Sequence, residues 1–250
     1  MKSKKKLSIM IIFVGIVALV IFGIFNFVKP TPKISGKNVK AQNSSRKNVI
    51  SLPEKSDSEE WNLILVNAKN VLSKDPDFQK VAVDQPYGDS GNIYVDQRIQ
   101  KALRKFRTAA ENAGYPTIFI SGYRSYDTQK SLYEAAGGSS QNPVLTQRPG
   151  ASEHETGLAF DLVGQQIWNQ VGALQPTQLE AGKDQQWLII NAPKFGFILR
   201  YPKGKEAIKQ TGIDYESWHF RYVGVKNAEY IMNNNLTLEE YISLLKKAGR

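Results

Sequence analysis

The sequence predicts an α+β fold, with a small, mostly antiparallel sheet and flanking helices, in one domain behind an N-terminal apolar segment. Three observations support this prediction. Helical apolar stripes and short β-branched strands are mixed along the chain without a βαβ repeat. Roughly 190 residues follow Asp57, enough for one compact domain with its own core. An unbroken apolar run precedes that domain near the N-terminus.

The apolar run spans residues 9–25 and continues to residue 28 with one polar interruption. At about 1.5 Å rise per residue this length approaches the ~30 Å of a bilayer core. Residues 8–28 are therefore expected to form a transmembrane anchor behind a basic tail, residues 1–7. Lys and Arg lie on both flanks of the run, so charge alone does not settle whether this tail is cytoplasmic. A cleaved signal peptide is the alternative, but Pro30 and Pro32 follow the run where a small-x-small cleavage site would be needed.

The net charge of +10 is concentrated ahead of the domain. Residues 1–55 contain 11 of the 33 Lys and Arg but one of the 23 Asp and Glu, so the rest of the chain has 22 of each. A nucleic-acid enzyme would concentrate basic charge on its domain, so no nucleic-acid partner is expected. Residues 29–56 are expected to be a basic disordered linker and residues 57–250 the domain. The absence of Cys excludes disulfides and thiolate catalysis.

Apolar periodicity and capping residues predict the elements of the domain. Helices are expected over residues 57–72, 96–114, 126–136, 185–193 and 237–245. The last of these opens with a capping box formed by Thr237 and Glu240. Strands are expected over residues 117–120, 157–163, 195–201 and 217–223. Residues 138–151 and 164–186 are expected to be long loops that act as lids or substrate walls.

Asp161 stands out in the strand expected over residues 157–163. Side chains alternate along a strand, so Leu158, Phe160 and Leu162 share one face and Asp161 lies on the other, among small residues. A carboxylate in an apolar strand is costly unless something pairs with it. A metal ion would pair with it, and a strand acid hydrogen-bonded to backbone is the alternative.

The chain has only two histidines, and each lies in a polar motif. His154 is placed in the loop that enters the strand, because Gly157 argues against a continuous helix. His219 follows Glu216 by three residues. A catalytic zinc takes three His or carboxylate ligands and leaves a fourth position for a water, whose pKa it lowers to about 7. A further carboxylate is then needed to move the proton, and Glu216 is the candidate.

The motif from Ser152 to Asp161, Ser-Glu-His-Glu-Thr-Gly-Leu-Ala-Phe-Asp, is followed by Glu-Ser-Trp-His at residues 216–219. These motifs resemble the zinc D-alanyl-D-alanine carboxypeptidase family, which includes the vancomycin-resistance carboxypeptidases and the L,D-carboxypeptidases of Gram-positive bacteria. The similarity extends to Ser-Gly-Tyr-Arg-Ser-Tyr at residues 121–126 and covers roughly residues 83–224. Ser217 departs from the Pro of many members, with little expected consequence at a spacer position.

The resemblance implies a role for each motif residue. One zinc ion per chain would be bound by His154, Asp161 and His219, and Glu216 would be the general base. Arg124 would stabilise the negative charge that develops on the carbonyl oxygen. Substrate contacts are implied for Ser152, Gln129, Tyr123 and Trp218.

Other interpretations stay open for several of these residues. Arg124 could be a solvated surface charge, and Ser152 could be a turn residue. Glu153 and Glu155 flank His154 and are expected to be solvated or to lie behind the ligands, with less effect on turnover.

The resemblance implies a cell-wall enzyme that removes C-terminal D-Ala from peptidoglycan stem peptides, by L,D- or D,D-cleavage, with its motifs closest to the L,D branch. It also places the domain outside the cell, held at the membrane by one span. A peptidoglycan endopeptidase or D,D-dipeptidase of the same fold is one alternative. A non-catalytic zinc-containing wall-binding module is another, although a structural zinc would need no spare carboxylate such as Glu216. Ser-His-Asp catalysis is a weak rival, because Gly-x-Ser-x-Gly is absent.

Overall fold

The computed structural model describes residues 51–83, 92–138 and 146–250, which form one compact unit. The tail, the anchor and nearly all of the linker expected from the sequence lie in residues 1–50, outside the described residues. Those expectations stay predictions. Within the described ranges, no helix is both long enough and apolar enough to span a bilayer.

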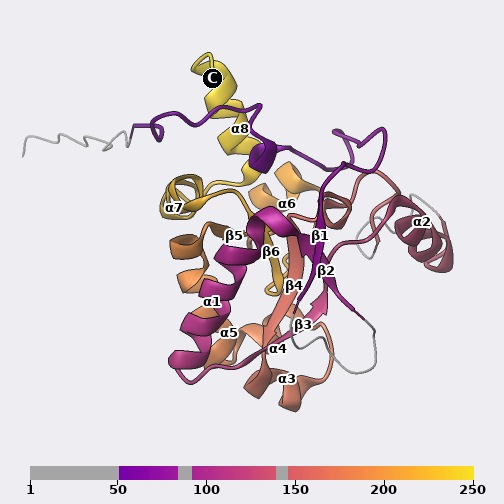
Figure 1. Cartoon of the computed structure of the whole chain (residues 1–250), viewed down its shortest axis with the longest axis vertical. Coiled ribbons are helices and arrows are strands. Elements are labelled where there is room, and N and C mark those ends of the chain that lie inside the picture. The colour runs from indigo at the N-terminus through magenta and orange to yellow at the C-terminus, as the bar shows by residue number, and fades with distance from the viewer. Residues whose placement is uncertain (1–50, 84–91, 139–145) are drawn as a thin grey trace, which may run out of the picture. The chain divides into compact units, whose positions relative to one another are not determined.

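A four-stranded antiparallel sheet lies at the centre of the domain, with strand order β3-β4-β6-β5 (Figure 1). Its strands are β3 (Thr117–Ser121), β4 (Ala159–Gly164), β5 (Phe197–Leu199) and β6 (His219–Tyr222). The four predicted strands and the α+β class with a small antiparallel sheet are confirmed. A separate antiparallel pair, β1 (Lys80–Ala82) with β2 (Tyr94–Asp96), is not among the predicted strands.

Helices flank the central sheet in the described part of the chain (Figure 1). The α-helices are α1 (Gln100–Asn112), α2 (Tyr126–Ala135), α3 (Gln165–Val171), α4 (Pro176–Glu180), α5 (Lys183–Asn191), α6 (Lys205–Thr211), α7 (Val225–Asn233) and α8 (Leu238–Lys247). Single 3-10 turns are η1 (Trp61–Leu63), η2 (Gln97–Ile99), η3 (Glu153–Thr156) and η4 (Ala192–Phe195).

The two faces of the central sheet carry different side chains. On one face, Phe160 of β4 and Phe220 of β6 pack with Phe106 of α1 in the main apolar cluster, which α5 also enters. On the other face, Ile198 of β5 packs under α7 and α8, and Val163 of β4 packs under α3 and α4. The polar side chains of β4 and β6 lie on this second face as well, because strand residues alternate.

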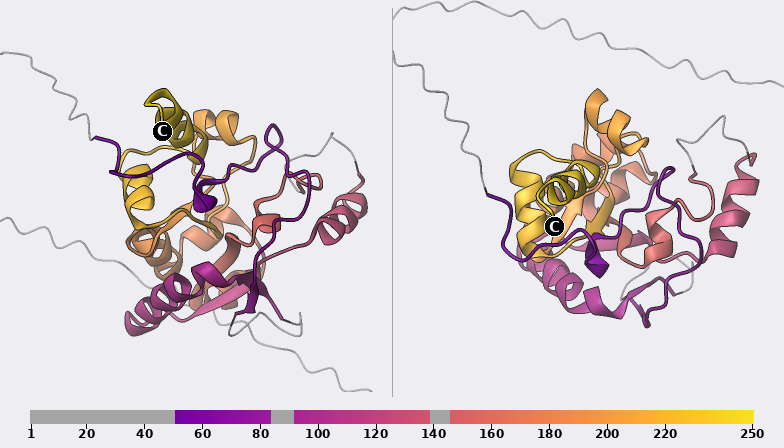
Figure 2. Two further views of the ribbon diagram at one scale, coloured as in Figure 1. Left: turned by 45° about the horizontal axis from the view of Figure 1, so that its top comes forward. Right: turned by 90° about the horizontal axis from the view of Figure 1, so that it is seen from above.

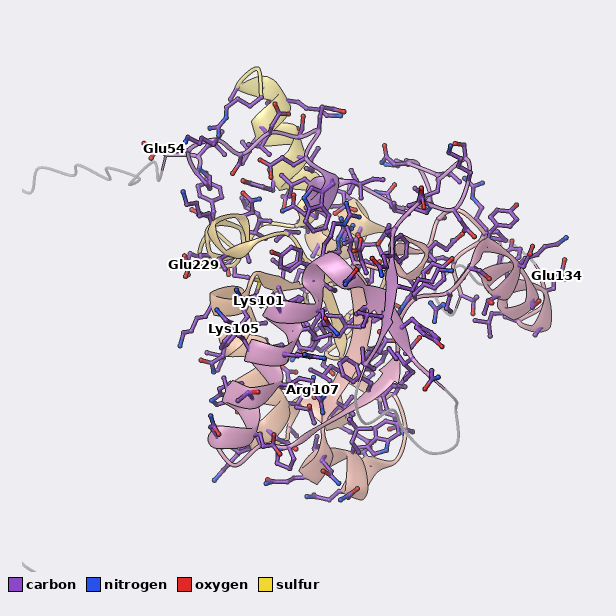
Figure 3. All side chains as sticks on the ribbon, in the orientation of Figure 1. Glu54, Lys101, Lys105, Arg107, Glu134 and Glu229 are labelled. Carbon is purple, nitrogen blue, oxygen red and sulfur yellow. The ribbon has the colours of Figure 1, made fainter. Side chains whose placement is uncertain are left out.

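Helix α1 confirms the stripe predicted from Asp96 onward. Phe106 and its apolar neighbours on the stripe are buried, whereas Lys101 and Lys105 are exposed and project from the outer side of the helix (Figure 3). Gly114 follows the helix with φ of 83°, a left-handed conformation that favours glycine. Helices α2, α5 and α8 also form where they are expected, within a few residues at each end, and α8 opens with the predicted capping box.

The helix predicted over residues 57–72 is wrong. Only η1 is helical there, and the rest crosses the domain as an irregular segment (Figure 2). The carbonyl oxygens of Asn62 and Ile64 accept hydrogen bonds from Arg221, at 3.2 and 2.7 Å. Because backbone groups that bond a buried guanidinium are satisfied without a helix, tertiary contacts override the apolar stripe.

The long loop predicted over residues 164–186 is also wrong, since this stretch holds α3, α4 and the start of α5. Helices of seven and five residues are too short for their periodicity to be recognised. Asp184 supports α3 from 17 residues further along the chain, because its carboxylate accepts a hydrogen bond from the Ile167 amide at 3.0 Å. Helix α6, with seven residues, escapes the prediction for the same reason of length. Helix α7, with nine residues, is not among the predicted helices either.

Replacing Arg221 is expected to destabilise the fold strongly. Its side chain is fully buried and donates to the Glu153 carboxylate at 2.8 Å as well as to the two carbonyls of the crossing segment. Arg221→Met keeps much of the volume but leaves these acceptors short of a donor, so the free energy of unfolding should fall by about 3–5 kcal/mol. Urea unfolding of the metal-free protein measures this loss. Lys101→Ala is the control and should change stability by less than about 0.5 kcal/mol.

Candidate metal centre

His154 lies on η3, a single 3-10 turn where the sequence predicts a plain loop. The turn ends at Gly157, whose φ of 69° is left-handed and where a Cβ would come within 2.5 Å of the Phe78 ring. Nδ1 of His154 is 2.7 Å from the Gly122 carbonyl oxygen. A carbonyl only accepts, so Nδ1 carries the proton and Nε2 keeps its lone pair. That lone pair faces Oδ2 of Asp161 at 3.4 Å.

Asp161 and His219 are direct partners in the antiparallel register of β4 and β6. Their side chains therefore lie on the same face of the sheet. Nδ1 of His219 is 3.0 Å from Oδ1 of Asp161. Phe160 pairs with Phe220 in the same register and packs in the main apolar cluster, so the predicted alternation of this strand is confirmed.

The three predicted ligands converge into one buried group. One ligand atom from each of His154, Asp161 and His219 lies within 4.8 Å of the other two. Two imidazole nitrogens and a carboxylate oxygen are a donor set that catalytic zinc sites use. The His154 lone pair and the carboxylate oxygen that faces it would repel each other unless a proton or a cation lay between them. The residues present therefore fit a zinc ion.

Burial and neighbouring charges set the protonation of these ligands. Burial lowers the pKa of His154 to about 4, and the Arg124 guanidinium acts in the same direction. Burial also works to lower the pKa of His219, but the hydrogen-bonded carboxylate of Asp161 and the nearby carboxylate of Glu153 raise it to about 9. Burial opposes the ionisation of Asp161, yet the two histidines hold its pKa far below the usual range. At neutral pH, His154 and Asp161 are ready to bind a metal, whereas His219 releases a proton on binding.

Glu216 reaches the same group from the segment that leads into β6. Its Oε2 is 3.7 Å from Nδ1 of His219, and its side chain is 24% exposed while the ligands are almost closed off. Burial raises the pKa of Glu216 to about 7, although His219 acts to lower it. A carboxyl group with a pKa near the working pH both accepts and returns a proton, as a general base must.

Arg124 lies next to η3 and is held there by hydrogen bonds to the residues around it. Its backbone N–H donates to the His154 carbonyl at 3.1 Å, and its guanidinium donates to Ser121 Oγ at 3.2 Å and to Ser152 Oγ at 3.4 Å. Gln129 accepts from Nε of Arg124 at 3.0 Å and is buried. The structure therefore brings Arg124 and Ser152 together. Gln129 positions the guanidinium through this bond, and its predicted substrate contact stays a prediction.

Tyr123 and Trp218 are the other residues for which substrate contacts are predicted. The Tyr123 hydroxyl donates to Asp75 at 3.4 Å, and the Lys80 ammonium lies 4.2 Å from the centre of its ring. Trp218 is 8% exposed and packs with Val163 in the apolar cluster under α3 and α4. The burial of Trp218 indicates a packing role and gives the predicted contact no support.

Glu155 is buried, so of the two expected positions, solvated or behind the ligands, the solvated one is excluded. Its carboxylate accepts from the backbone amides of Gly150 at 2.8 Å and Ser152 at 3.3 Å, so it fixes the chain that enters η3. The Ser-x-x-Glu spacing of a capping box is the sequence signal that indicates this role.

Glu153 is fully buried as well, and its Oε1 accepts from Arg200 Nε and Arg221 Nη1, each at 2.8 Å. The two arginines hold its pKa far below the usual range against the effect of burial. Its arginine partners are 47 and 68 residues away in the chain, so no local pattern indicates this cluster.

Comparison with known proteins assigns the domain to a family. Residues 92–225 match the VanY family model, described as D-alanyl-D-alanine carboxypeptidase. A D-alanyl-D-alanine carboxypeptidase of Enterococcus faecalis is 33% identical over 224 residues, which cover 85% of this chain and 76% of that protein. The Bacillus subtilis protein YodJ, which carries a carboxypeptidase name, is 40% identical over 157 residues, 62% of this chain. The match spans about half of YodJ, 55% of its length.

Solved structures share the fold. The LdcB LD-carboxypeptidase superimposes with a TM-score of 0.64 at 37% identity, covering 73% of this chain and 86% of that chain. The VanY D,D-pentapeptidase, solved as a point mutant in complex with Zn(II), gives a TM-score of 0.57 at 33% identity, covering 73% and 99%. Zinc in that relative agrees with the ligand set built by His154, Asp161 and His219. The chain belongs to the VanY family of D-alanyl-D-alanine carboxypeptidases.

Proposed function

We propose that the chain is a zinc-dependent carboxypeptidase that removes the C-terminal D-Ala from peptidoglycan stem peptides. One observation carries the proposal: three buried ligand atoms converge beside a partly exposed carboxylate, that of Glu216, which is outside the ligand group. A site that only stored a metal would need no such group. The family membership of the chain supports the same reaction class.

The ligand atoms follow from the hydrogen bonds. His154 would hold the zinc through Nε2 and His219 through Nδ1, because these nitrogens face the Asp161 carboxylate. When bound, a zinc ion with three protein ligands activates a water and polarises the substrate carbonyl.

The chain's own residues supply the proton transfer and the charge stabilisation. Glu216 accepts the proton of the attacking water on its carboxylate and returns it to the amine nitrogen of the departing residue. Arg124 donates to the carbonyl oxygen, where negative charge develops. Its guanidinium is held by Gln129 and Ser121, so it is oriented before the substrate binds.

Recognition of the free C-terminus is assigned to Ser152 together with Arg124. A carboxypeptidase must bind a terminal carboxylate, and the Arg124 guanidinium is a cation that the structure places next to Ser152. The hydrogen bond between Nη2 of Arg124 and Oγ of Ser152 is long, at 3.4 Å, so both groups have donor capacity for a carboxylate.

Ser152→Ala is expected to raise KM with little change in kcat, because the lost contact is made to bound substrate and transition state alike. A hydrogen bond to a charged group contributes about 1.5–3 kcal/mol, so the expected rise is about 10- to 100-fold. Steady-state kinetics on a stem peptide measures both constants. Ser131→Ala, on the exposed side of α2, is the control and should leave both unchanged. A fall in kcat at constant KM would contradict the assignment.

Cleavage between an L- and a D-residue, giving a tripeptide from a tetrapeptide stem, is the specificity that we favour. The support is the similarity of the Tyr-Arg-Ser-Tyr and Ser-Glu-His-Glu-Thr-Gly motifs to the L,D branch, and the 37% identity to the LD-carboxypeptidase structure. Mass spectrometry of pentapeptide and tetrapeptide stems, incubated with the zinc-loaded full-length protein, tests it. Release of D-Ala from the tetrapeptide is expected. Cleavage of the pentapeptide alone makes the chain a D,D-enzyme.

Two alternatives are outcomes of the same measurement. Release of an internal fragment from cross-linked muropeptides would make the chain an endopeptidase, and cleavage of the free dipeptide D-Ala-D-Ala would make it a dipeptidase. No product from any substrate would favour a zinc-containing wall-binding module.

The cellular location proposed for the enzyme follows from its proposed substrate. Peptidoglycan stem peptides lie outside the cytoplasmic membrane, and the apolar residues 8–28 have the length of a membrane span. We propose that this segment anchors the domain on the outer side of the cell membrane. Fractionation of the expressed full-length protein, with protease added to intact spheroplasts, tests both the anchor and its orientation.

A further inference from the structure

Glu153 lies behind the metal centre, and only half of its carboxylate is satisfied. Oε1 accepts from Arg200 and Arg221, whereas Oε2 has no hydrogen-bond partner. A buried acceptor without a donor loses its hydration without compensation, so such atoms are rare in folded proteins. The position of Oε2 therefore needs an explanation from its surroundings.

The surroundings contain a second atom in the same condition. Nε2 of His219 is buried, has no hydrogen-bond partner and lies 3.6 Å from Oε2 of Glu153. The carboxylate oxygen can only accept a hydrogen bond and the imidazole nitrogen can donate one, so each atom is a suitable hydrogen-bond partner for the other. A separation of 3.6 Å is too long for a hydrogen bond, and a shift of about 0.6 Å would form one.

We propose that Glu153 is a positioning residue for His219. Its Oε2 accepts a hydrogen bond from the N–H at Nε2, fixes the ring in that tautomer and leaves the Nδ1 lone pair directed at the metal. Histidine ligands commonly donate their second N–H to a carboxylate or carbonyl in this way. His154 has the reverse arrangement, with Nδ1–H on the Gly122 carbonyl, so the two histidines bind through different nitrogens. The inference rests on the proposed zinc site.

The two arginines extend this support into the rest of the fold. Arg200 also binds both carboxylate oxygens of Glu239 on α8, at 2.7 and 2.9 Å. Arg221 also binds the carbonyl of Ile64 in the crossing segment. Both of these partners lie outside residues 92–225, the part that matches the family model. The orientation of one metal ligand is thereby tied to segments that flank the family-matching part of the chain.

Glu153→Gln is the informative change, because its outcome follows from hydrogen-bond direction. Guanidinium groups have no acceptor, so the amide oxygen must stay with Arg200 and Arg221. The amide NH2 then faces Nε2 of His219 and favours the tautomer with the proton on Nδ1, which blocks the metal-binding nitrogen. The zinc dissociation constant, measured by competition with a chromophoric chelator, should rise by about 10- to 100-fold.

Two variants separate this effect from general damage to the buried charges. Glu239→Gln removes a carboxylate from the same arginine cluster without touching His219, and its zinc affinity should stay within about twofold of wild type. Glu153→Asp keeps the charge for the arginines but shortens the reach to Nε2, so it should fold and show a smaller loss of affinity. Equal weakening in Glu239→Gln and Glu153→Gln, or a folded Glu153→Gln with wild-type affinity, would overturn the proposal.

Nitrogen NMR of the zinc-loaded wild-type protein supplies a readout that does not depend on any variant. With only two histidines in the chain, all four ring nitrogens can be assigned. The proposal requires a proton on Nε2 of His219 and on Nδ1 of His154, and the reverse state of His219 overturns it even if Glu153→Gln does not fold. Absence of zinc binding by the wild type would instead remove the proposed function, so the two failures are distinguishable.

Discussion

His219→Ala and His154→Ala are each expected to abolish zinc binding and hydrolysis together. The chain has no third histidine, and the remaining carboxylate with one imidazole is too small a set for a catalytic zinc. Metal analysis should fall from one zinc per chain to nearly none, and product formation should fall below detection. Added zinc at micromolar concentration should not restore either, because a site that has lost one of its three ligands binds zinc too weakly to be filled.

Thermal unfolding gives the matching physical measurement. Zinc that binds only the folded state stabilises it by about 2.7 kcal/mol at a free concentration of 100 times the dissociation constant. The melting temperature of the wild type should therefore rise with zinc, and that of either variant should not. The exposed Lys101→Ala variant is the control and should respond like the wild type. A histidine variant that kept stoichiometric zinc would show that the ligand set is different.

Glu216→Ala is expected to retain zinc and lose most of the turnover. Glu216 lies outside the ligand group, with its Oε2 at 3.7 Å from His219, so metal content should stay near one per chain. A general base contributes about 100- to 10,000-fold to the rate, so kcat should fall by that factor with a small change in KM. Asp214→Asn, an exposed acid on the same segment, is the control and should keep full activity.

The pH profile follows from the same group. The carboxylate form of Glu216 is the base, so activity is lost as the pH falls through its pKa. Burial raises that pKa to about 7, and a bound cation beside it would lower it. The acidic limb of kcat/KM in the wild type is therefore expected at or below pH 7, and it should be absent from the residual activity of Glu216→Ala. Retained activity in that variant would remove Glu216 from the mechanism.

The elements that sequence patterns predict well are those whose local preferences agree with their tertiary position. Helix α1 has a regular apolar stripe, and α8 has a capping box, so both form where they are expected. The segment over residues 57–72 also has a stripe, but its carbonyls bind Arg221, more than 150 residues away. No local pattern reports a bond of that separation, which is why the predicted helix fails.

The candidate site divides in the same way. Asp161 is recognisable because a carboxylate in an alternating apolar strand needs a partner. Gln129 and Trp218 are polar or aromatic residues near motifs, and sequence alone cannot tell a substrate contact from a buried support. The structure assigns Gln129 to the Arg124 guanidinium and Trp218 to an apolar cluster.

The sequence by itself determined which residues are available for the chemistry, because two histidines, one strand carboxylate and Glu216 leave few other ways to build a zinc site. The tertiary structure alone decided how they are arranged. The β4–β6 register sets Asp161 against His219, and the Gly122 carbonyl selects the free nitrogen of His154. Glu153 is a candidate support for His219 only in the folded chain, where Arg221 of β6 and Arg200, which follows β5, bind its carboxylate. Long-range pairing of buried charges depends on where strands meet, and that position is not encoded in any short stretch of the chain.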